Sequence, residues 1–477
     1  MTTTHTFFSS FKTAALALAI FSVFMQCSEE EMLPVSREPL PLPADTTKVS
    51  SPLVTADCSE CAFVVPADST IIDGLVIGLK PGDVIGLSSG VDYGTLEFHN
   101  IVGTKEQPII IKNCNGKAII RATDDAYAVK TVRSRFFRMT GGTVSGEYGI
   151  DIQGGTMGIQ LTGLSTNFEV DHVEISNVGF AGIIAKTDPT CDDATIRGNF
   201  TMYDVTLHNN YIHDTGGEGF YVGNSFYDGM DRKECGKRLP HEIKGLKIFN
   251  NIVHDTGWDA IQVGCAIEGT EIHHNEVRNY GKANKLYQNN GIQIGSGTGG
   301  LVYNNLIKNG SGNGMMMNGI GDNVVYNNII VNAGSNGIFC DERYTPGQGF
   351  TFVNNTILNP KKDGIRLYSE LVPMNTVVNN IIAAPGTIDE YTNSRSSEDA
   401  YVYVMSKDCN VNMSNNLFVR TVEEVLFVDP AKDNYRLNPT SPAVNFGKDI
   451  DRFNISKDFY LVSRLKGRAY DIGASEF

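Results

Sequence analysis

One short pattern recurs along the middle of this chain, a pair of asparagines between short apolar runs. From second residue to second residue, the steps are 41, 24, 30, 23, 27, 25 and 36 residues, and the long steps contain visible insertions. A repeat of about 25 residues predicts a solenoid, in which stacked units bury a continuous core. The pairs are Asn209-Asn210, Asn250-Asn251, Asn304-Asn305, Asn327-Asn328, Asn354-Asn355, Asn379-Asn380 and Asn415-Asn416, and His274-Asn275 fills the remaining gap.

The segments between these pairs are typical of β-strands. They are short, rich in Ile and Val, and alternate with a period of two, and none looks helical. Each repeat therefore carries about three short strands that stack into parallel sheets. We expect the Asn pair at a bend that needs left-handed backbone, where stacked amides can bond to one another. The competing leucine-rich repeat lacks its Leu ladder here.

Between about residues 80 and 420, the repeated coil resembles the right-handed parallel β-helix of pectate lyases, chondroitinase-B-type lyases and polygalacturonases. Residues 79–85 and 103–111 look like the opening coils of bacterial polysaccharide-lyase β-helices. The resemblance implies an all-β fold, a solenoid of about 10–12 coils. We place this β-helix at residues 57–420.

The last residues form a separate prediction. Residues 434–437 and 471–474 look like the closing segment of Bacteroidetes surface β-helix proteins. An open stack would expose strand edges, so we expect residues 421–477 to form a cap over the last coil.

The first 26 residues predict a signal peptide. Lys12 precedes an apolar stretch that is too short to span a membrane, and Cys27 with an acidic run follows at once. This resembles the lipoprotein signal of Bacteroidetes surface proteins, which implies lipidation of Cys27, a place at the outer surface of the outer membrane, and membrane contact only through the lipid. The alternative is an ordinary secretory signal with an incidental cysteine. Residues 27–56, rich in Pro, Thr and Ser, predict a flexible tether.

The charge composition of the chain limits the kinds of molecule that it can bind. A net charge of −15 at pH 7 disfavours nucleic acid, because phosphate contacts need a basic surface. We expect a monomer with a polysaccharide as its partner. Export allows disulfides, and Cys191, Cys235 and Cys265 lie in corresponding connections, so one disulfide among these three is expected.

The strand after each Gly-rich turn orients its side chains by alternation. The residues expected inside the core are Phe220, Val222, Ile261, Val263, Ile292 and Ile294. Tyr221, Gln262 and Gln293 then point outward, one above another. Lys186 lies outward one coil earlier, and Arg366 lies farther along.

In the resembling families this outward face is the floor of the substrate groove. A row of Lys, Tyr and Gln predicts sugar contacts there, with Gln262, Gln293 and Arg366 binding substrate. The alternative is that any solenoid surface must display some polar side chains.

A long insertion beside this face is locally basic. It contains Arg232, Lys233 and Arg238, which we assign to substrate binding because a basic loop can attract a uronate polymer. The alternative is a solvated loop without such a role.

Two matching turns, His213-Asp214-Thr215-Gly216 and His254-Asp255-Thr256-Gly257, must stack on adjacent coils. Glu218 and Asp259 follow them at the start of the candidate strand. These groups could act as acid, base or Ca²⁺ ligands, with Glu218 and Asp259 as the tentative metal pair and no other cofactor expected. The alternative is that the Asp and Thr residues only close the turns.

Three functions fit these features. The first is a polysaccharide lyase that cleaves a uronate-containing glycan by β-elimination, with Lys186, His213, Glu218, Tyr221 and Asp259 as catalytic candidates. The second is a glycoside hydrolase on the same fold that uses Glu218 and Asp259 as its acid–base pair. The third is a non-catalytic glycan-binding surface protein. We rank the lyase first, although the Arg-His-Gly signature strand of chondroitinase-B-type lyases is absent.

Overall fold

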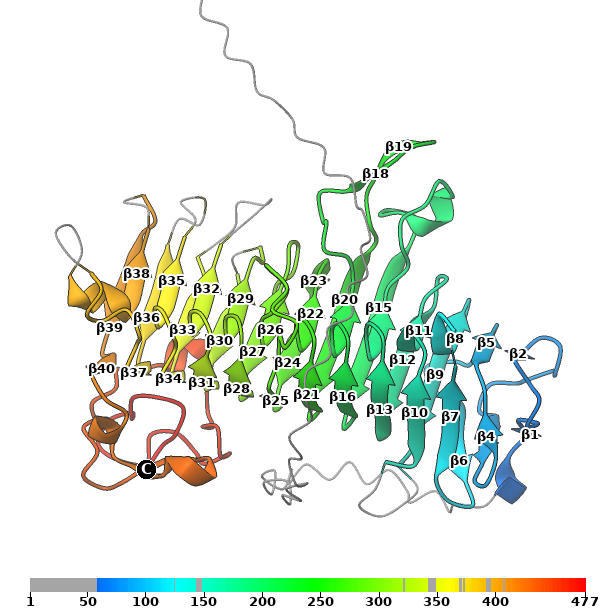
Figure 1. Ribbon diagram of the computed structural model, residues 1–477, viewed down its shortest axis with the longest axis horizontal. Coiled ribbons are helices and arrows are strands. Elements are labelled where there is room, and N and C mark those ends of the chain that lie inside the picture. The colour runs from blue at the N-terminus through cyan, green and yellow to red at the C-terminus, as the bar shows by residue number, and fades with distance from the viewer. Residues whose placement is uncertain are drawn as a thin grey trace, which may run out of the picture. The chain divides into compact units, whose positions relative to one another are not determined.

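The computed structural model describes residues 58–123, 125–142, 148–320, 322–341, 349–368, 371, 374–391, 396–405 and 408–477 (Figure 1). The predicted signal peptide (1–26), lipidation site Cys27 and tether (27–56) lie outside the described residues. None of the helices in the described part of the chain is long and apolar enough to cross a membrane.

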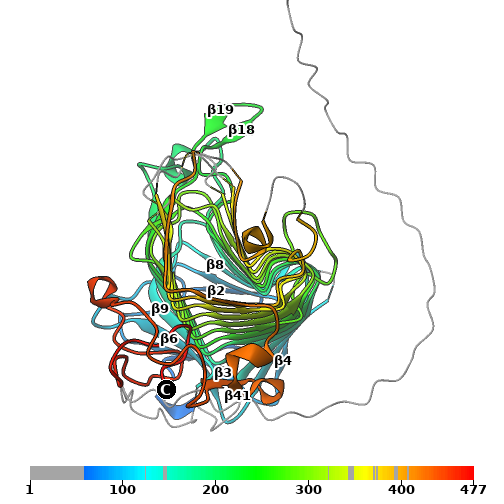
Figure 2. The same cartoon turned by 90° about the vertical axis from the view of Figure 1, so that its left-hand side faces the viewer.

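Three parallel sheets run the length of the described structure, and each coil passes through all three (Figures 1 and 2). We call them sheet 1, sheet 2 and sheet 3, in the order in which a coil meets them. Sheets 2 and 3 contain 12 strands each. This is a parallel β-helix, so the predicted all-β solenoid is confirmed, and its coil number falls at the upper end of the expected range.

Sheet 1 has the longest strands. Its members, in spatial order, are β1 (Phe63–Val64), β3 (Val84–Ser88), β6 (Ile109–Cys114), β9 (Arg135–Thr140), β12 (Thr166–Asp171), β15 (Thr201–His208), β20 (Glu242–Phe249), β24 (Glu271–His273), β27 (Leu301–Tyr303), β30 (Val324–Tyr326), β33 (Thr351–Val353), β36 (Asn375–Val378) and β39 (Val411–Ser414), with β23 (Ala266–Glu268) paired to β20.

Sheet 2 follows the asparagine bend. Its members are β4 (Asp92–Tyr93), β7 (Ala118–Ala122), β10 (Ile150–Gly154), β13 (Val173–Val178), β16 (Tyr211–Thr215), β21 (Ile252–Thr256), β25 (Glu276–Arg278), β28 (Leu306–Gly310), β31 (Ile329–Ala333), β34 (Thr356–Leu358), β37 (Ile381–Ala383) and β40 (Leu417–Val419).

Sheet 3 follows the Gly-rich turn. Its members are β2 (Ile71–Asp73), β5 (Leu96–His99), β8 (Tyr127–Val132), β11 (Met157–Leu161), β14 (Ile183–Ala185), β17 (Phe220–Val222), β22 (Ile261–Val263), β26 (Ile292–Ile294), β29 (Met315–Met317), β32 (Ile338–Cys340), β35 (Ile365–Leu367) and β38 (Val402–Val404).

The remaining elements lie outside the coil sheets. They are two antiparallel pairs, β18 (Met230–Arg232) with β19 (Gly236–Arg238) and β41 (Phe427–Asp429) with β42 (Asn434–Leu437), and the short 3-10 helices η1 (Cys58–Glu60), η2 (Asp193–Thr195), η3 (Ser397–Ala400), η4 (Glu423–Val425), η5 (Pro430–Lys432) and η6 (Asp451–Phe453).

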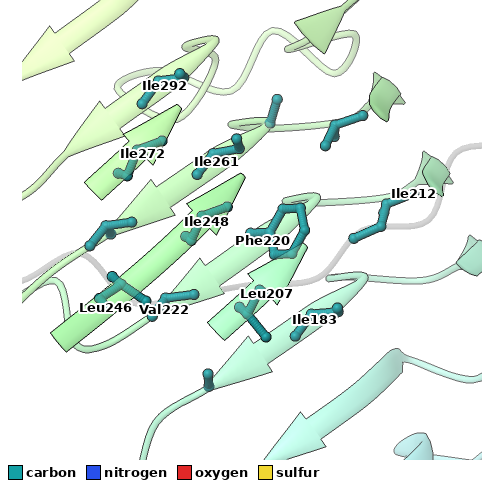
Figure 3. Packing of buried hydrophobic residues seen from close by; sticks show 14 of the residues in the cluster. Ile183, Leu207, Ile212, Phe220, Val222, Leu246, Ile248, Ile261, Ile272 and Ile292 are labelled. Atoms are coloured by element: carbon teal, nitrogen blue, oxygen red, sulfur yellow. The ribbon is translucent and has the colours of Figure 1, made fainter. Parts of the chain in front are cut away.

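Alternate side chains of each strand fill the interior of the coils (Figure 3). Phe220, Val222, Ile261 and Ile292 are all completely buried there, as are Val263 and Ile294. The inward positions predicted for sheet 3 are therefore confirmed. Burial of these aliphatic side chains is the main favourable contribution to the fold.

An asparagine ladder forms the corner between sheets 1 and 2. The first residue of each pair has left-handed backbone, as at Asn209 (φ 53°) and Asn304 (φ 52°). The second residue donates its side-chain amide to the oxygen of the next one, over distances of 2.9–3.1 Å. Both roles predicted for the pair are confirmed. The ladder consists of Asn210, Asn251, Asn275, Asn305, Asn328, Asn355, Asn380 and Asn416.

The last residues correct one expectation. The segment after residue 420 lies along the side of sheet 2 instead of across the last coil (Figure 2). Its Phe427 and Ile472 pack in one cluster with Ile329 and Ile381 of the coils. The reason is the apolar outer surface of β28, β31 and β37, which needs cover along its length. Sheets 1, 2 and 3 end at β39, β40 and β38, with no further described strand paired to them.

Two disulfides cross-link the described chain. Cys191 and Cys235 form one of them, as expected for the corresponding connections. Cys58 of η1 and Cys114 at the end of β6 form the other, a pairing that the sequence did not predict. Cys265 is buried and belongs to neither.

Candidate active site on sheet 3

The pairing of strands in sheet 3 places the predicted row of outward side chains on the outer surface of that sheet. Tyr221 pairs with Gln262, and Gln262 pairs with Gln293, on three successive coils. The residue in register one coil earlier is Ile184, and Lys186 follows it just after the end of β14. The four residues therefore share one sheet, with Lys186 displaced toward the outer connection.

Lys186 is held in place by a carboxylate and an aromatic ring. Its Nζ lies 2.9 Å from Asp188 Oδ1 and 4.3 Å from the centre of the Tyr221 ring. Burial acts to lower the pKa of Lys186, but Tyr221 and Asp188 outweigh it, so the pKa lies above its usual value. The ammonium therefore stays charged at neutral pH, which suits it to bind an anion and not to act as a base.

Tyr221 and Gln262 meet at Ser225, a residue that sequence reasoning missed. The Tyr221 and Ser225 hydroxyl oxygens are 3.0 Å apart, and Gln262 Nε2 donates to Ser225 Oγ at 2.7 Å. Gln262 is only 2% exposed. It was predicted to contact substrate, but the structure gives it a supporting position behind Ser225 because the connection after β17 folds over it.

A second ladder of polar side chains lies at the bend between sheets 2 and 3. Asn290 Nδ2 donates to Asp259 Oδ1 at 3.0 Å, and Asn313 Nδ2 donates to Asn290 Oδ1 at 2.8 Å. Backbone bonds hold consecutive members in register, since Gly219 N donates to the Asp259 carbonyl at 3.1 Å. We call this the mixed ladder, and its members are Glu218, Asp259, Asn290, Asn313, Asn336 and Asp363.

Glu218 opens the mixed ladder as a buried acid. The residue has no exposed surface, and neither carboxyl oxygen has a hydrogen-bond partner in another residue of the described chain. Burial raises the pKa of Glu218 to about 7, although its own backbone amide and the Lys186 charge act in the opposite direction. Both protonation states are therefore populated near neutral pH, as general acid–base chemistry requires.

Asp259 is completely buried beside Glu218 on the next coil. Burial raises its pKa well above the usual value; the Asn290 hydrogen bonds oppose this rise, and the Glu218 charge adds to it. One amide atom of Gln293 lies 3.0 Å from Asp259 Oδ2 and 3.1 Å from Asn290 Nδ2. If that atom is oxygen, it accepts from Asn290, and a bond to Asp259 requires a protonated carboxyl. If it is nitrogen, it donates to the carboxylate and to the Tyr287 carbonyl, 3.2 Å away, but faces the Asn290 amide nitrogen.

The same pair was assigned as a tentative Ca²⁺ site. Calcium requires six to eight oxygen ligands, mostly from charged carboxylates, and the raised pKa values of Glu218 and Asp259 favour their neutral forms. In the described ranges the grouped metal-type ligands are Glu169, Asp171 and His208 on sheet 1, where Arg138 already binds Asp171 at 2.7 Å. The calcium role of Glu218 and Asp259 stays a prediction.

His213 lies on a different sheet from the other catalytic candidates. It belongs to β16 of sheet 2, where its ring stacks on His254 at 5.2 Å and its Nδ1 lies 2.8 Å from Asp214 Oδ2. The Gly-rich bend turns the chain between His213 and Glu218, so the grouping of His213 with the sheet 3 residues was wrong.

The basic insertion contains the antiparallel pair of β18 and β19 and projects away from the coils (Figure 1). Arg232 Nε donates to the Pro189 carbonyl at 2.8 Å, and Arg238 Nε donates to the Thr190 carbonyl at 2.9 Å. Arg238 also pairs with Asp193. These two arginines therefore hold neighbouring loops together, which was not predicted, while Lys233 is exposed.

Arg366 lies in the same outward row but three strands beyond Gln293. It pairs with Asp363 at 2.9 Å, and its guanidinium lies 4.7 Å from the Tyr403 ring centre. The structure thus places it at the far end of the face, about 15 Å from Gln293 at the usual strand spacing.

One sequence signal could have revealed the mixed ladder. From β17 to β35, a polar residue directly precedes the small residue before each sheet 3 strand, as in Asn290-Gly291, Asn313-Gly314 and Asn336-Gly337. Glu218-Gly219, Asp259-Ala260 and Asp363-Gly364 occupy the same place. Comparison of these positions would have shown three acids and three amides along the ladder as a group worth testing.

Comparisons with known proteins agree with this architecture. A family model described as a right handed beta helix region matches residues 204–418. The fold is therefore the right-handed parallel β-helix that the sequence predicted. No curated protein matches the chain.

Solved structures similar to this chain include several polysaccharide lyases. The pectate lyase Pel9A is 15% identical over 83% of this chain and 88% of its own, with a TM-score of 0.49. A mannuronic acid specific polysaccharide family 6 lyase from human gut microbiota is 15% identical over 76% of this chain and 83% of its own, with a TM-score of 0.41. A PL6 family polysaccharide lyase from Pseudopedobacter saltans is 14% identical over 80% of this chain and 100% of its own, with a TM-score of 0.38. At these identities the similarity says nothing about the activity of this chain.

Proposed function

We propose that this protein is a carbohydrate-active β-helix protein that cleaves a uronate-containing glycan by β-elimination on sheet 3. The observation that carries the proposal is the charged Lys186 beside the Tyr221 hydroxyl, next to a buried acid, Glu218, with a pKa of about 7.

Each of these groups matches one requirement of the reaction. The Lys186 ammonium binds the uronate carboxylate and so makes the neighbouring C–H bond more acidic. The Tyr221 hydroxyl oxygen takes that proton while the hydroxyl gives its own proton to the departing glycosidic oxygen. The C–O bond breaks as the new carbon–carbon double bond forms, so the atoms balance without water. Glu218 is a positioning residue, because its charge acts on Lys186 from below the surface.

The test is a panel of uronate polymers and neutral glycans incubated with the purified protein. The proposal expects a new near-ultraviolet absorbance from the double bond, with uronate polymers only. Lys186→Met and Tyr221→Phe should each lower kcat by about 100-fold or more. Lys285→Met is the matched control, because Lys285 lies over the Trp258 ring at 5.1 Å and outside the proposed chemistry. Chelation of divalent ions in the same assay tests the calcium prediction.

One observation favours a glycoside hydrolase as the second candidate. Glu218 and Asp259 are two carboxyl groups on adjacent coils, and both have raised pKa values, as a general acid needs. New reducing ends without new absorbance would support this candidate over the lyase. Binding without either product would support the third candidate, a glycan-binding surface protein.

We also propose that the protein is anchored at the outer surface of the outer membrane through a lipid on Cys27. This rests on the signal sequence alone. Cys27→Ala should move the protein from the membrane fraction to the soluble fraction after cell lysis. If the variant stays in the membrane fraction, the anchor is not at Cys27.

A further inference from the structure

A groove on sheet 1 has no part in the proposed chemistry. It has a volume of about 510 Å³ and lies where β9, β12 and β15 begin. Arg133, Arg135, Thr166, Asn199 and Tyr203 contribute to its lining. The row of Tyr221, Gln262 and Gln293 belongs to a different sheet, so this groove is separate from the candidate active site.

Register aligns three of these side chains on consecutive coils. Arg135 pairs with Thr166, and Tyr203 N donates to Thr166 Oγ1 at 2.7 Å. The row spans about 10 Å at the usual spacing of two strands. Tyr203 is 46% exposed, so a ligand can reach its ring as well as its hydroxyl. The groove therefore offers a positive end, a hydroxyl and an aromatic surface in one line.

The two arginines of the groove carry charges that no neighbouring acid neutralises. Both are exposed, and within the described residues neither forms an ion pair or a side-chain hydrogen bond. By contrast, Arg138, farther along β9, binds Asp171 through two hydrogen bonds of 2.7 and 3.1 Å. No acidic residue is among the groove's lining residues. Two uncompensated guanidinium groups in one groove favour an anion, and their planar donors match a carboxylate or sulfate group.

We propose that this groove is a second glycan-binding site, which binds an anionic oligosaccharide through its carboxylate or sulfate groups. Arg133 and Arg135 hold the anionic group, Thr166 and Asn199 bond to sugar hydroxyls, and Tyr203 packs against a sugar ring. The proposal concerns binding alone, and its test does not require cleavage in the groove. This second binding site goes beyond the proposed function, because binding in the groove requires no catalysis on sheet 3.

The composition of the groove favours a glycan over a nucleic acid. Nucleic-acid sites combine a long basic groove that follows several phosphates with aromatic rings for successive bases. This groove provides two arginines and one exposed tyrosine in a protein with a net charge of −15, which is enough for one anionic group and one sugar ring. The site should also be insensitive to pH near neutrality, because guanidinium groups stay charged, and it should weaken with salt.

The experiment is isothermal titration calorimetry of the protein carrying Tyr221→Phe. This substitution prevents cleavage of the ligand during the measurement. The probes are a uronate hexasaccharide, a sulfated hexasaccharide, a neutral hexasaccharide and a short single-stranded DNA. The test variant adds Arg133→Ala with Arg135→Ala. The matched control adds Lys466→Ala with Arg468→Ala, which removes the same charge from exposed positions of the C-terminal segment.

The arginine variant should bind at least one anionic hexasaccharide about 10-fold more weakly or worse, while the control keeps its affinity. The uronate and sulfated probes show which anionic group is preferred, and either preference supports the site. Equal binding of the neutral probe, tighter binding of DNA, an equal loss in the control variant, or no loss in the arginine variant would each overturn the proposal. These results do not depend on cleavage, so they stand apart from the test of sheet 3 activity.

Discussion

Two ladders of buried polar side chains hold the corners of the same coils, and they differ in one respect. The asparagine ladder runs from Asn210 to Asn416 with an amide at every step. The mixed ladder begins with two acids, Glu218 and Asp259, and continues with amides from Asn290. Asp259 accepts hydrogen bonds from Asn290, whereas the Glu218 carboxyl has no hydrogen-bond partner in another described residue and so adds no bond between coils.

This difference between the ladders shows where a buried side chain destabilises the folded state. An amide can donate and accept at once, whereas a carboxylate can only accept, so a buried acid in a ladder needs a cation or a proton. Asp363 in the same ladder has the cation Arg366 at 2.9 Å and the Thr387 hydroxyl at 2.8 Å. Glu218 has no such partner in the described chain, and burial raises its pKa instead. A buried acid without a partner, at a position that an amide could fill, is what makes Glu218 a candidate for a functional role.

The largest effect should come from placing an acid in the asparagine ladder. Asn328 Nδ2 faces three acceptors, the Val302 and Tyr326 carbonyls and Asn355 Oδ1. Asn328→Asp would turn a donor into a buried negative oxygen among them, which should cost about 4 kcal/mol of unfolding free energy at pH 7. Urea unfolding measures this loss.

The control for this change is Asn332→Asp. Asn332 bonds to Asn309 at an exposed position, so the acid remains hydrated there and little stability should be lost. If both variants lost the same stability, burial in the ladder would not be the cause.

The next effect concerns Glu218 and depends on pH. Its pKa is raised from 4.5 to about 7, so the folded state prefers the protonated acid. The protonated side chain makes its full contribution to the free energy of unfolding below pH 4.5, and this contribution is lost as the pH rises through about 7. Glu218→Gln removes this loss, so the variant should exceed the wild type by about 3 kcal/mol at pH 8 and match it at pH 4. Urea unfolding across this range measures the difference.

An exposed acid provides the comparison for this prediction. Glu390→Gln changes the same chemical group at an exposed position. It is the matched control for the loss of a carboxyl group. A stability difference between Glu218→Gln and the wild type that does not change with pH would mean that folding does not raise the pKa of Glu218.

Sequence reasoning predicted the fold better than the site. The Asn pairs repeat in the sequence because each has a backbone role and a ladder role, so they located every corner between sheets 1 and 2 from β15 onward. The alternation of apolar and polar residues along the strands of sheet 3 likewise predicted that Tyr221, Gln262 and Gln293 align on successive coils. His213 was misplaced because the sequence showed the Gly-rich turn but not that the residues on its two sides belong to different sheets. The burial of Gln262 depends on Ser225, a contact that a one-dimensional pattern does not contain.

A smaller effect distinguishes two roles of Asp259. If the acid is neutral, Asp259→Asn replaces it with the residue that the ladder carries elsewhere. The bond from Asn290 at 3.0 Å survives, and unfolding free energy should stay within about 1 kcal/mol of the wild type. Asp259→Ala loses this acceptor and should cost about 2 kcal/mol. Equal losses in the two variants would show that Asp259 is needed as a charged group, for example as a metal ligand.

The smallest effect links the mixed ladder to the surface. The Lys186 charge acts to lower the pKa of Glu218, as one of two influences that oppose burial. Lys186→Met keeps the length of the side chain and removes the charge, so the pKa of Glu218 should rise above its present value of about 7. The pH at which the stability advantage of Glu218→Gln reaches half its full size should then move upward in the Lys186→Met background. Thermodynamic linkage requires this shift if the two charges interact, whether or not a glycan is cleaved. An unchanged midpoint would separate Lys186 from the acid pair and leave the lysine as a surface anion site only.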